Sequence, residues 1–222
     1  MRLTREERAA RRTAFRQMNL ADKADYLFTY YKLPITLAAL ALALVLSGVY
    51  RQATKKDVVL YAAYLNLSVG EDLDAQLNEG FLSASGYDPR KTEVYRYRAL
   101  YLSDNPSEEN LQYAYTSNLK LLAAASAGQI DLALMNREAY DILSRNGYLM
   151  ELPELLPASL SPVLEPYLTA HGDTVNALEV SGLPLFQSAG FPETVFLGVV
   201  TNCPRLPAAV EYIEYLAEGS GT

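Results

Sequence analysis

The feature that most constrains this 222-residue chain is a charge-free apolar run of 18 residues, Leu33 to Tyr50. As a helix with a rise of about 1.5 Å per residue, the run would be roughly 27 Å long, close to the ~30 Å hydrocarbon core of a bilayer. A soluble core helix would need a polar face, and positions 37–46 provide none. The run therefore predicts a transmembrane helix whose partner is the lipid bilayer.

A cleaved signal peptide is the main alternative for this run. Signal peptides have a short charged region before the apolar segment and a small-residue cleavage site after it. Here 32 residues precede the run, and no A-x-A-like site follows it. A retained anchor is therefore favoured.

Charge is distributed unevenly on the two sides of the run. Residues 1–56 contain 11 Lys and Arg against 4 Asp and Glu, whereas residues 57–222 contain 8 against 22. The positive-inside rule places the basic tail in the cytoplasm and the acidic body outside, which predicts a single-pass protein of the cell membrane. The acidic body argues against nucleic-acid binding, which needs clustered basic side chains. The predicted domains are a cytoplasmic tail (1–32), a transmembrane helix (33–50), a linker (51–56) and an extracytoplasmic domain (57–222).

Beyond the linker, strand-like and helix-like segments alternate. Strands are predicted over 57–67, 92–102, 130–135, 174–180 and 194–202, and a closing helix over 204–219. Helices are predicted between the first strands and after the third. Right-handed crossovers between such strands give a three-layer α/β domain with a mostly parallel sheet. The predicted fold class is therefore α/β, with one N-terminal transmembrane helix before this domain.

Cap and stop residues delimit the three internal helices. The predicted N-terminal caps are Ser68, Ser107 and Asn136, and the predicted stops are Gly86, Gly128 and Gly147. The first helix has a packed stripe of Leu73, Leu77 and Phe81. The second carries Leu111, Tyr115, Leu119 and Leu122 at helical spacing.

The segment 121–152 resembles the helix–strand–helix of bacterial extracellular solute-binding proteins of the type 2 periplasmic-binding-protein class. The residues that carry the resemblance are Ala127, Gly128, Asp131, Gly147, Leu149 and Leu152. The closing segment 195–216 is similar to the return strand and final helix of that fold, and the "YYK" before the apolar run resembles small anchored relatives in Gram-positive bacteria. Only 45 residues separate Leu149 from Val195, too few for a second lobe of typical domain size. The resemblance thus implies a one-lobed relative.

Polar residues follow the three predicted parallel strands. In open α/β sheets, ligands bind beyond the carboxyl ends of the strands. The candidate binding residues there are Asn66, Ser68, Asp104, Asn136 and Arg137. Because Arg137 adds a forked cation, a small anionic solute is the expected ligand. The alternative is that these residues serve only as caps and turns.

Residues for catalysis or metal binding are scarce. His171 and Cys203 are the only histidine and the only cysteine, and no G-x-S-x-G elbow occurs. We expect His171 on a surface loop and Cys203 as a small buried residue. The sequence therefore predicts no enzyme activity, no cofactor and no metal.

One predicted strand is rich in tyrosine and arginine. Tyr95, Tyr97 and Tyr101 share a face of the strand 92–102. They could form an aromatic platform for a sugar or a peptide. The favoured alternative is an edge strand whose tyrosines pack under a helix.

Together these patterns predict a membrane-anchored extracytoplasmic recognition domain without catalysis. It would bind a small solute or a partner protein, such as a permease or an envelope protein, in a transport or envelope assembly. The alternative is a structural interaction module that keeps the fold without binding a ligand. An envelope hydrolase is the third possibility.

Overall fold

The computed structural model describes residues 19, 33–34, 36–48, 50 and 55–219. The chain divides into two compact units, Met1–Lys55 and Lys56–Thr222, and each is described by itself. Except for Asn19, the predicted tail over 1–32 lies outside the described residues, and so do residues 51–54 of the predicted linker.

The described residues do not show the predicted transmembrane helix. The described helical residues of the first unit are 33–34, 36–48 and 50. Within the described part of the chain, no helix is both long and apolar enough to cross a membrane. This part of the fold-class prediction was wrong, and the predicted localisation stays a prediction.

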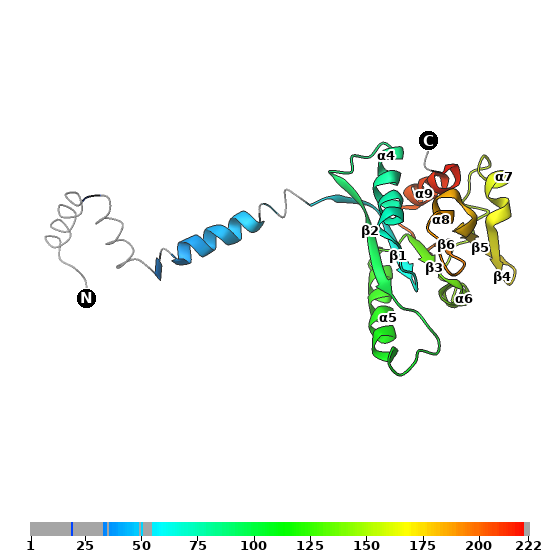
Figure 1. Ribbon diagram of the computed structural model, residues 1–222, viewed down its shortest axis with the longest axis horizontal. Helices are drawn as coiled ribbons and strands as arrows, with labels where there is room; N and C mark the ends of the chain where they lie inside the picture. The colour runs from blue at the N-terminus through cyan, green and yellow to red at the C-terminus, as the bar shows by residue number, and fades with distance from the viewer. Residues whose placement is uncertain (1–18, 20–32, 35, 49, 51–54, 220–222) are drawn as a thin grey trace. The chain divides into compact units, whose positions relative to one another are not determined.

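The second unit is an α/β domain built on six strands in the order β2-β1-β3-β6-β5-β4. This order runs from left to right in Figure 1. The strands are β1 (Asp57–Leu65), β2 (Thr92–Leu100), β3 (Leu132–Met135), β4 (Leu168–His171), β5 (Thr174–Glu179) and β6 (Phe196–Val199).

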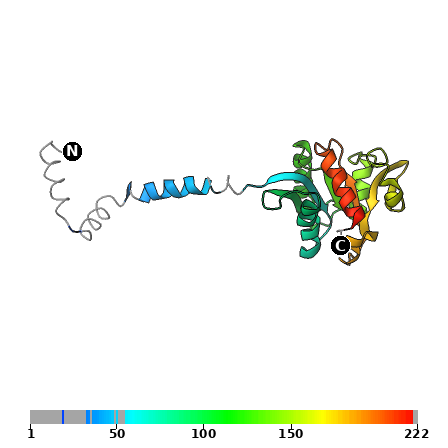
Figure 2. The ribbon, with the colours of Figure 1, turned by 90° about the horizontal axis from the view of Figure 1, so that it is seen from above.

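Helices connect and cover these strands. The longer ones are α5 (Leu111–Ser126), α6 (Arg137–Arg145) and α9 (Leu206–Glu218), the red helix in Figure 2. Between β1 and β2 the chain forms α3 (Glu71–Ala75), a π-helical turn η1 (Gln76–Gly80) and α4 (Phe81–Ala84). Short helical turns fill the later connections: α7 (Ser161–Leu164), η2 (Glu165–Tyr167), η3 (Val180–Gly182) and α8 (Pro184–Gln187).

The sheet is mixed rather than mostly parallel, so this part of the fold-class prediction was also wrong. β1 is parallel to β2 and β3, whereas β6 is antiparallel to β3, β5 to β6 and β4 to β5. Helical crossovers join only the first three strands. β4 and β5 form a hairpin whose turn contains Gly172 at φ 62°, and a hairpin necessarily gives antiparallel strands. His171 ends β4 instead of lying on a loop.

Two hydrophobic clusters cover the two faces of the sheet. On one face, α9 packs against the helical segment between β1 and β2, and the Phe81 and Tyr212 rings meet edge to face at 4.8 Å. Leu73, Leu77 and Phe81 are all buried here, which confirms the predicted stripe. The other face is covered by α6 and, in part, by α5.

The helix starts differ from the prediction in two of three cases. Asn136 caps α6, because its Oδ1 accepts the Ala139 N–H at 3.1 Å, as predicted. The caps assigned to Ser68 and Ser107 were wrong. α3 begins after Gly70 and α5 after Asn110, and neither N-cap residue makes a side-chain cap bond.

A buried ion pair joins the start of β3 to the start of α9. Asp131 is fully buried, and its Oδ2 accepts from Arg205 Nε at 2.9 Å and from the Tyr61 N–H at 2.8 Å. The Arg205 guanidinium lies 4.4 Å from the centre of the Tyr61 ring. Because both charges are paired and hydrogen-bonded, the carboxylate is tolerated in the core and ties three elements together.

Candidate functional site

A pocket of about 510 Å³ lies beyond the carboxyl ends of β1, β2 and β3. β1 and β3 run parallel and end side by side, so the residues that follow them, Asn66 and Asn136, reach the same edge of the sheet. The polar side chains in the lining are Asn66, Ser68, Asn136, Glu138 and Glu193, and the aromatic ones are Tyr101, Tyr113 and Phe191. A second hollow of about 660 Å³ adjoins it, sharing Ser68, Phe191 and Pro192.

Asn66 and Asn136 bond to each other across the pocket floor. Asn66 has φ 59°, a left-handed conformation that asparagine tolerates better than most residues. Its Nδ2 donates to Asn136 Oδ1 at 3.2 Å and to the Leu102 carbonyl at 2.7 Å, and its Oδ1 accepts the Leu102 N–H at 2.8 Å. This asparagine therefore fastens the end of β1 to the chain after β2.

These bonds consume most of the hydrogen-bonding capacity of the two amides. Asn136 Oδ1 accepts from both Asn66 and the Ala139 N–H, and its Nδ2 donates to Glu193 at 3.2 Å. A primary amide offers two donors and two acceptor lone pairs. One N–H of Asn136 and one lone pair of Asn66 are left for a ligand, so both residues act mainly as the turn and cap that the alternative interpretation described.

The structure brings together three of the five predicted site residues. Ser68 lines the pocket beside Asn66 and Asn136 and is exposed. Asp104 and Arg137 are not part of the lining. Asp104 pairs with Arg145 at 2.7 Å, and Arg137 pairs with Asp141 at 3.2 Å.

The Arg137 guanidinium is directed toward two aromatic rings. It lies 5.5 Å from the ring centre of Tyr140 and 5.7 Å from that of Phe196. Cation–π contacts of this kind and the ion pair to Asp141 account for its position. The forked cation on which the expected anionic solute depended is therefore engaged elsewhere.

Sequence reasoning missed the two carboxylates of the pocket and the rings of Tyr113 and Phe191, and it named Tyr101 only as part of a possible platform on the strand 92–102. Glu138 stands in the first turn of α6 and accepts from Ser103 Oγ at 2.6 Å. Its place two residues after the Asn136 cap was a usable signal. Glu193 is 57 residues from Asn136 along the chain. Tyr101 lies in a loop and Tyr113 in α5, and their stacked rings have centres 6.0 Å apart. No local pattern predicts such contacts.

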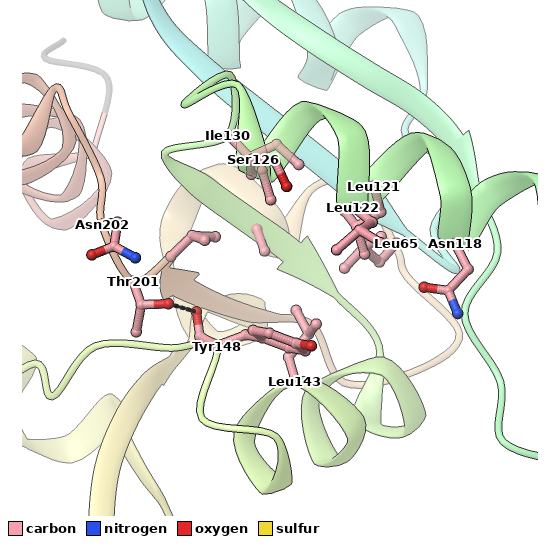
Figure 3. Close-up of a pocket in the computed structure, with 13 residues that line it drawn as sticks. Leu65, Asn118, Leu121, Leu122, Ser126, Ile130, Leu143, Tyr148, Thr201 and Asn202 are labelled. Carbon is pink, nitrogen blue, oxygen red and sulfur yellow. Dashed lines mark hydrogen bonds between the residues drawn. The ribbon is translucent and has the colours of Figure 1, made fainter.

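A smaller cavity of about 260 Å³ lies between α5 and α6 (Figure 3). Leu121 and Leu122 of α5 form one wall, and Leu143 and Tyr148 form the other. Leu65 and Ala133 of the sheet lie in its lining. Its lining is mainly apolar and shares no residue with the lining of the strand-end pocket.

The single histidine and the single cysteine both make contacts within the fold. The Cys203 thiol donates to Asp131 Oδ1 at 3.3 Å, and burial, followed by the nearby Asp131 charge, raises the pKa of this thiol to about 12. A thiol with such a pKa is a poor nucleophile near neutral pH. The His171 ring meets the Tyr140 ring edge to face at 6.1 Å. In the part of the chain that the structure describes, no group of three or more His, Cys, Asp or Glu side chains could hold a metal.

The favoured alternative for β2, an edge strand with packed tyrosines, is confirmed for the edge position and for Tyr97, whereas Tyr95 is 43% exposed. β2 is an edge strand, and Tyr97 is buried with its hydroxyl donating to Gln129 at 3.1 Å. Tyr95 and Tyr97 meet edge to face at 5.0 Å. Arg96 and Arg98, on the other face, both pair with the buried carboxylate of Asp74.

Comparisons of the chain with protein-family models, curated proteins and solved structures gave no match. The strand-end pocket must therefore be interpreted from its own chemistry.

Proposed function

We propose that the domain is a non-catalytic recognition domain that binds a small polar solute in the strand-end pocket. The observation that carries the proposal is this pocket of about 510 Å³ at the carboxyl ends of parallel strands, within the size range of ligand sites. As part of the same proposal, the domain is similar to one lobe of an extracellular solute-binding protein. The antiparallel β6, which returns beside β3 before α9, supports that similarity.

The charge of the lining favours an amine-bearing solute. Glu138 and Glu193 are both exposed carboxylates in the lining, and the stacked pair Tyr101 and Tyr113 adds aromatic surface. Carboxylates accept hydrogen bonds from an ammonium group, and aromatic faces attract cations. Because a single lobe leaves much of a solute exposed, the affinity should be modest, roughly micromolar to millimolar.

A thermal-shift screen of the chain tests this proposal. Primary amines, polyamines and quaternary ammonium compounds are compared with organic acids and sugars. We expect stabilisation by an amine, and we expect Glu193→Gln and Glu138→Gln to abolish it. Glu151→Gln is the matched control, since Glu151 is an exposed glutamate outside the pocket lining. Stabilisation only by organic acids, with loss in Arg137→Ala, would instead support the anionic solute and contradict the amine.

A partner-binding module is the second candidate function. It is favoured by a different observation, the exposed apolar face of α5. In that case no small molecule would stabilise the domain at millimolar concentration.

A further inference from the structure

Helix α5 turns its large apolar side chains outward. Leu111, Tyr115, Leu119 and Leu122, here called the α5 stripe, expose between 50% and 62% of their surface. The buried positions of the same helix are the small residues Ala114, Ser117 and Ala124. A helix that covers a core normally does the reverse. A contiguous exposed apolar patch of this kind marks an interaction site.

The α5 stripe continues into the cavity between α5 and α6. Leu122 belongs to both, and Tyr148, 49% exposed, faces it from the opposite wall (Figure 3). One surface therefore combines a ridge, formed by Leu111 and Tyr115, with a hollow of about 260 Å³ near the other end of the same helix.

A ridge at one end of α5 and a hollow near its other end complement each other in an antiparallel pair, which favours a second copy as the occupant, and the lack of charge on the α5 stripe permits it. Residues 57–222 carry 8 Lys and Arg against 22 Asp and Glu, so most faces of two copies repel each other. The sequence of α5 contains a single charged residue, Lys120, and its ammonium lies 5.6 Å from the centre of the Tyr97 ring of β2. The α5 stripe itself carries no charge, so here self-association meets no local repulsion.

We propose that two copies of this chain pair through their α5 stripes, with the two helices antiparallel about a twofold axis. A twofold interface must be self-complementary. Antiparallel pairing places the Leu111–Tyr115 ridge of each copy against Leu122 and the cavity of the other. It also places opposite ends of the two helix dipoles together. The proposal is independent of solute binding, because the strand-end pocket has a separate lining.

The available area indicates a weak dimer. The α5 stripe and Tyr148 are five large side chains that are about half exposed. An aromatic side chain buries about 150–250 Å² and a leucine less, so complete burial of these half-exposed side chains removes at most on the order of 500 Å² per copy and roughly 1,000 Å² in total. This total is at the lower limit of specific interfaces, so we expect a dissociation constant in the micromolar range.

Position-specific cross-linking of the full chain tests the antiparallel geometry. Leu111 and Leu122 are about 17 Å apart along the helix. Antiparallel pairing brings Leu111 of one copy to Leu122 of the other and keeps the two Leu111 positions apart. A mixture of Leu111→Cys and Leu122→Cys chains treated with a short bismaleimide should therefore cross-link several-fold more than either variant alone.

The controls for this experiment are a remote position and the unaltered chain. Val163→Cys replaces an apolar residue of α7 that is 51% exposed and should give only background. The unaltered chain reports the native Cys203, whose raised pKa keeps its reaction slow. Equal cross-linking by Leu111→Cys alone, or no excess in the mixture, would overturn the proposal.

Sedimentation velocity over a concentration series gives the second readout. Leu119→Glu should raise the dimer dissociation constant at least about tenfold, because it brings two carboxylates into an apolar interface. Val163→Glu should leave the constant unchanged. Thermal unfolding should be the same for both variants at low concentration, since both positions are half exposed. A chain that stays monomeric at ~100 μM, or a Leu119→Glu chain that pairs normally, would contradict the proposal.

Discussion

Helices α5 and α6 lie over the same face of the sheet, on opposite sides of one cavity, and they use their sequences in opposite ways. α6 buries Tyr140, Ile142 and Leu143, whereas α5 buries Ala114, Ser117 and Ala124. Both helices have apolar residues at helical spacing. Helical spacing of apolar residues therefore predicts that a helix has an apolar face, but it does not predict whether that face packs against the core of the same chain.

The two helices also begin differently. α6 has a side-chain cap from Asn136, which is itself held by Asn66. α5 follows a turn in which the Asn110 N–H donates to the Ser107 carbonyl at 2.9 Å, and Asn110 makes no side-chain cap bond. α6 is thus anchored to the strand ends, and α5 rests on the sheet through small side chains.

The largest expected contrast comes from truncating one tyrosine in each helix. Tyr140 is fully buried and stacks on Phe196 at 4.7 Å, so Tyr140→Ala should lower the free energy of unfolding by about 3–5 kcal/mol. Tyr115→Ala should change it by less than about 0.5 kcal/mol, because Tyr115 is 62% exposed. Urea unfolding measures the free energy of unfolding of both variants, at a protein concentration well below the dimer dissociation constant. Comparable losses would show that α5 is packed as firmly as α6.

The second contrast is between the two helix starts. Asn136→Ala should cost about 1–2 kcal/mol, because it removes the cap to Ala139 and the hydrogen bond from Asn66. Asn110→Ala should cost no more than about 0.5 kcal/mol, since no cap bond is lost. Thermal unfolding of the two variants decides the matter. Equal costs would mean that the cap is not what distinguishes α6.

The third and smallest contrast concerns the tyrosine hydroxyls. The Tyr140 hydroxyl donates to the buried Asn176 Oδ1 at 3.1 Å, so Tyr140→Phe should cost about 1 kcal/mol at neutral pH. Tyr115→Phe, at an exposed position, should cost less than about 0.5 kcal/mol. Urea unfolding at pH 7 measures the loss of stability in both variants. Similar losses would show that the Tyr140 hydroxyl contributes no more than the Tyr115 hydroxyl.

The stability of the Tyr140→Phe variant should also depend on pH differently from that of the unaltered chain. Burial raises the pKa of Tyr140 above its usual value, although the Ser144 hydrogen bond and the Arg137 charge oppose the shift. The neutral phenol is therefore favoured by folding. Its contribution to stability is complete below about pH 10 and is lost as the pH rises through the raised pKa. Tyr140→Phe should show a smaller alkaline loss than the unaltered chain, and an unchanged loss would assign the effect to other groups.

Sequence reasoning predicted every strand except β4, and also the closing helix. It predicted helix stops at Gly86, Gly128 and Gly147, and these three glycines have positive φ. These are local features, set by runs of β-branched and apolar residues and by the conformational freedom of glycine. It predicted three of the residues that line the strand-end pocket, because parallel strands bring their ends together. It missed β4 and the mixed sheet, because strand direction depends on how the connections pack. It also predicted a spanning helix over 33–50 from a charge-free run of sufficient length, whereas no helix among the described residues is long and apolar enough to cross a membrane.

Local sequence specified five of the six strands, the closing helix, three helix stops and the acidic charge of the domain. Those properties depend on residues close together in the chain. Only the tertiary structure decided that Glu193 joins Asn136 at the pocket, that Arg137 faces two rings, and that the α5 stripe points outward. The reason is that a side chain has no fixed surroundings until elements distant in sequence pack. Apolar residues at helical spacing are buried in the core in α6 and exposed in α5.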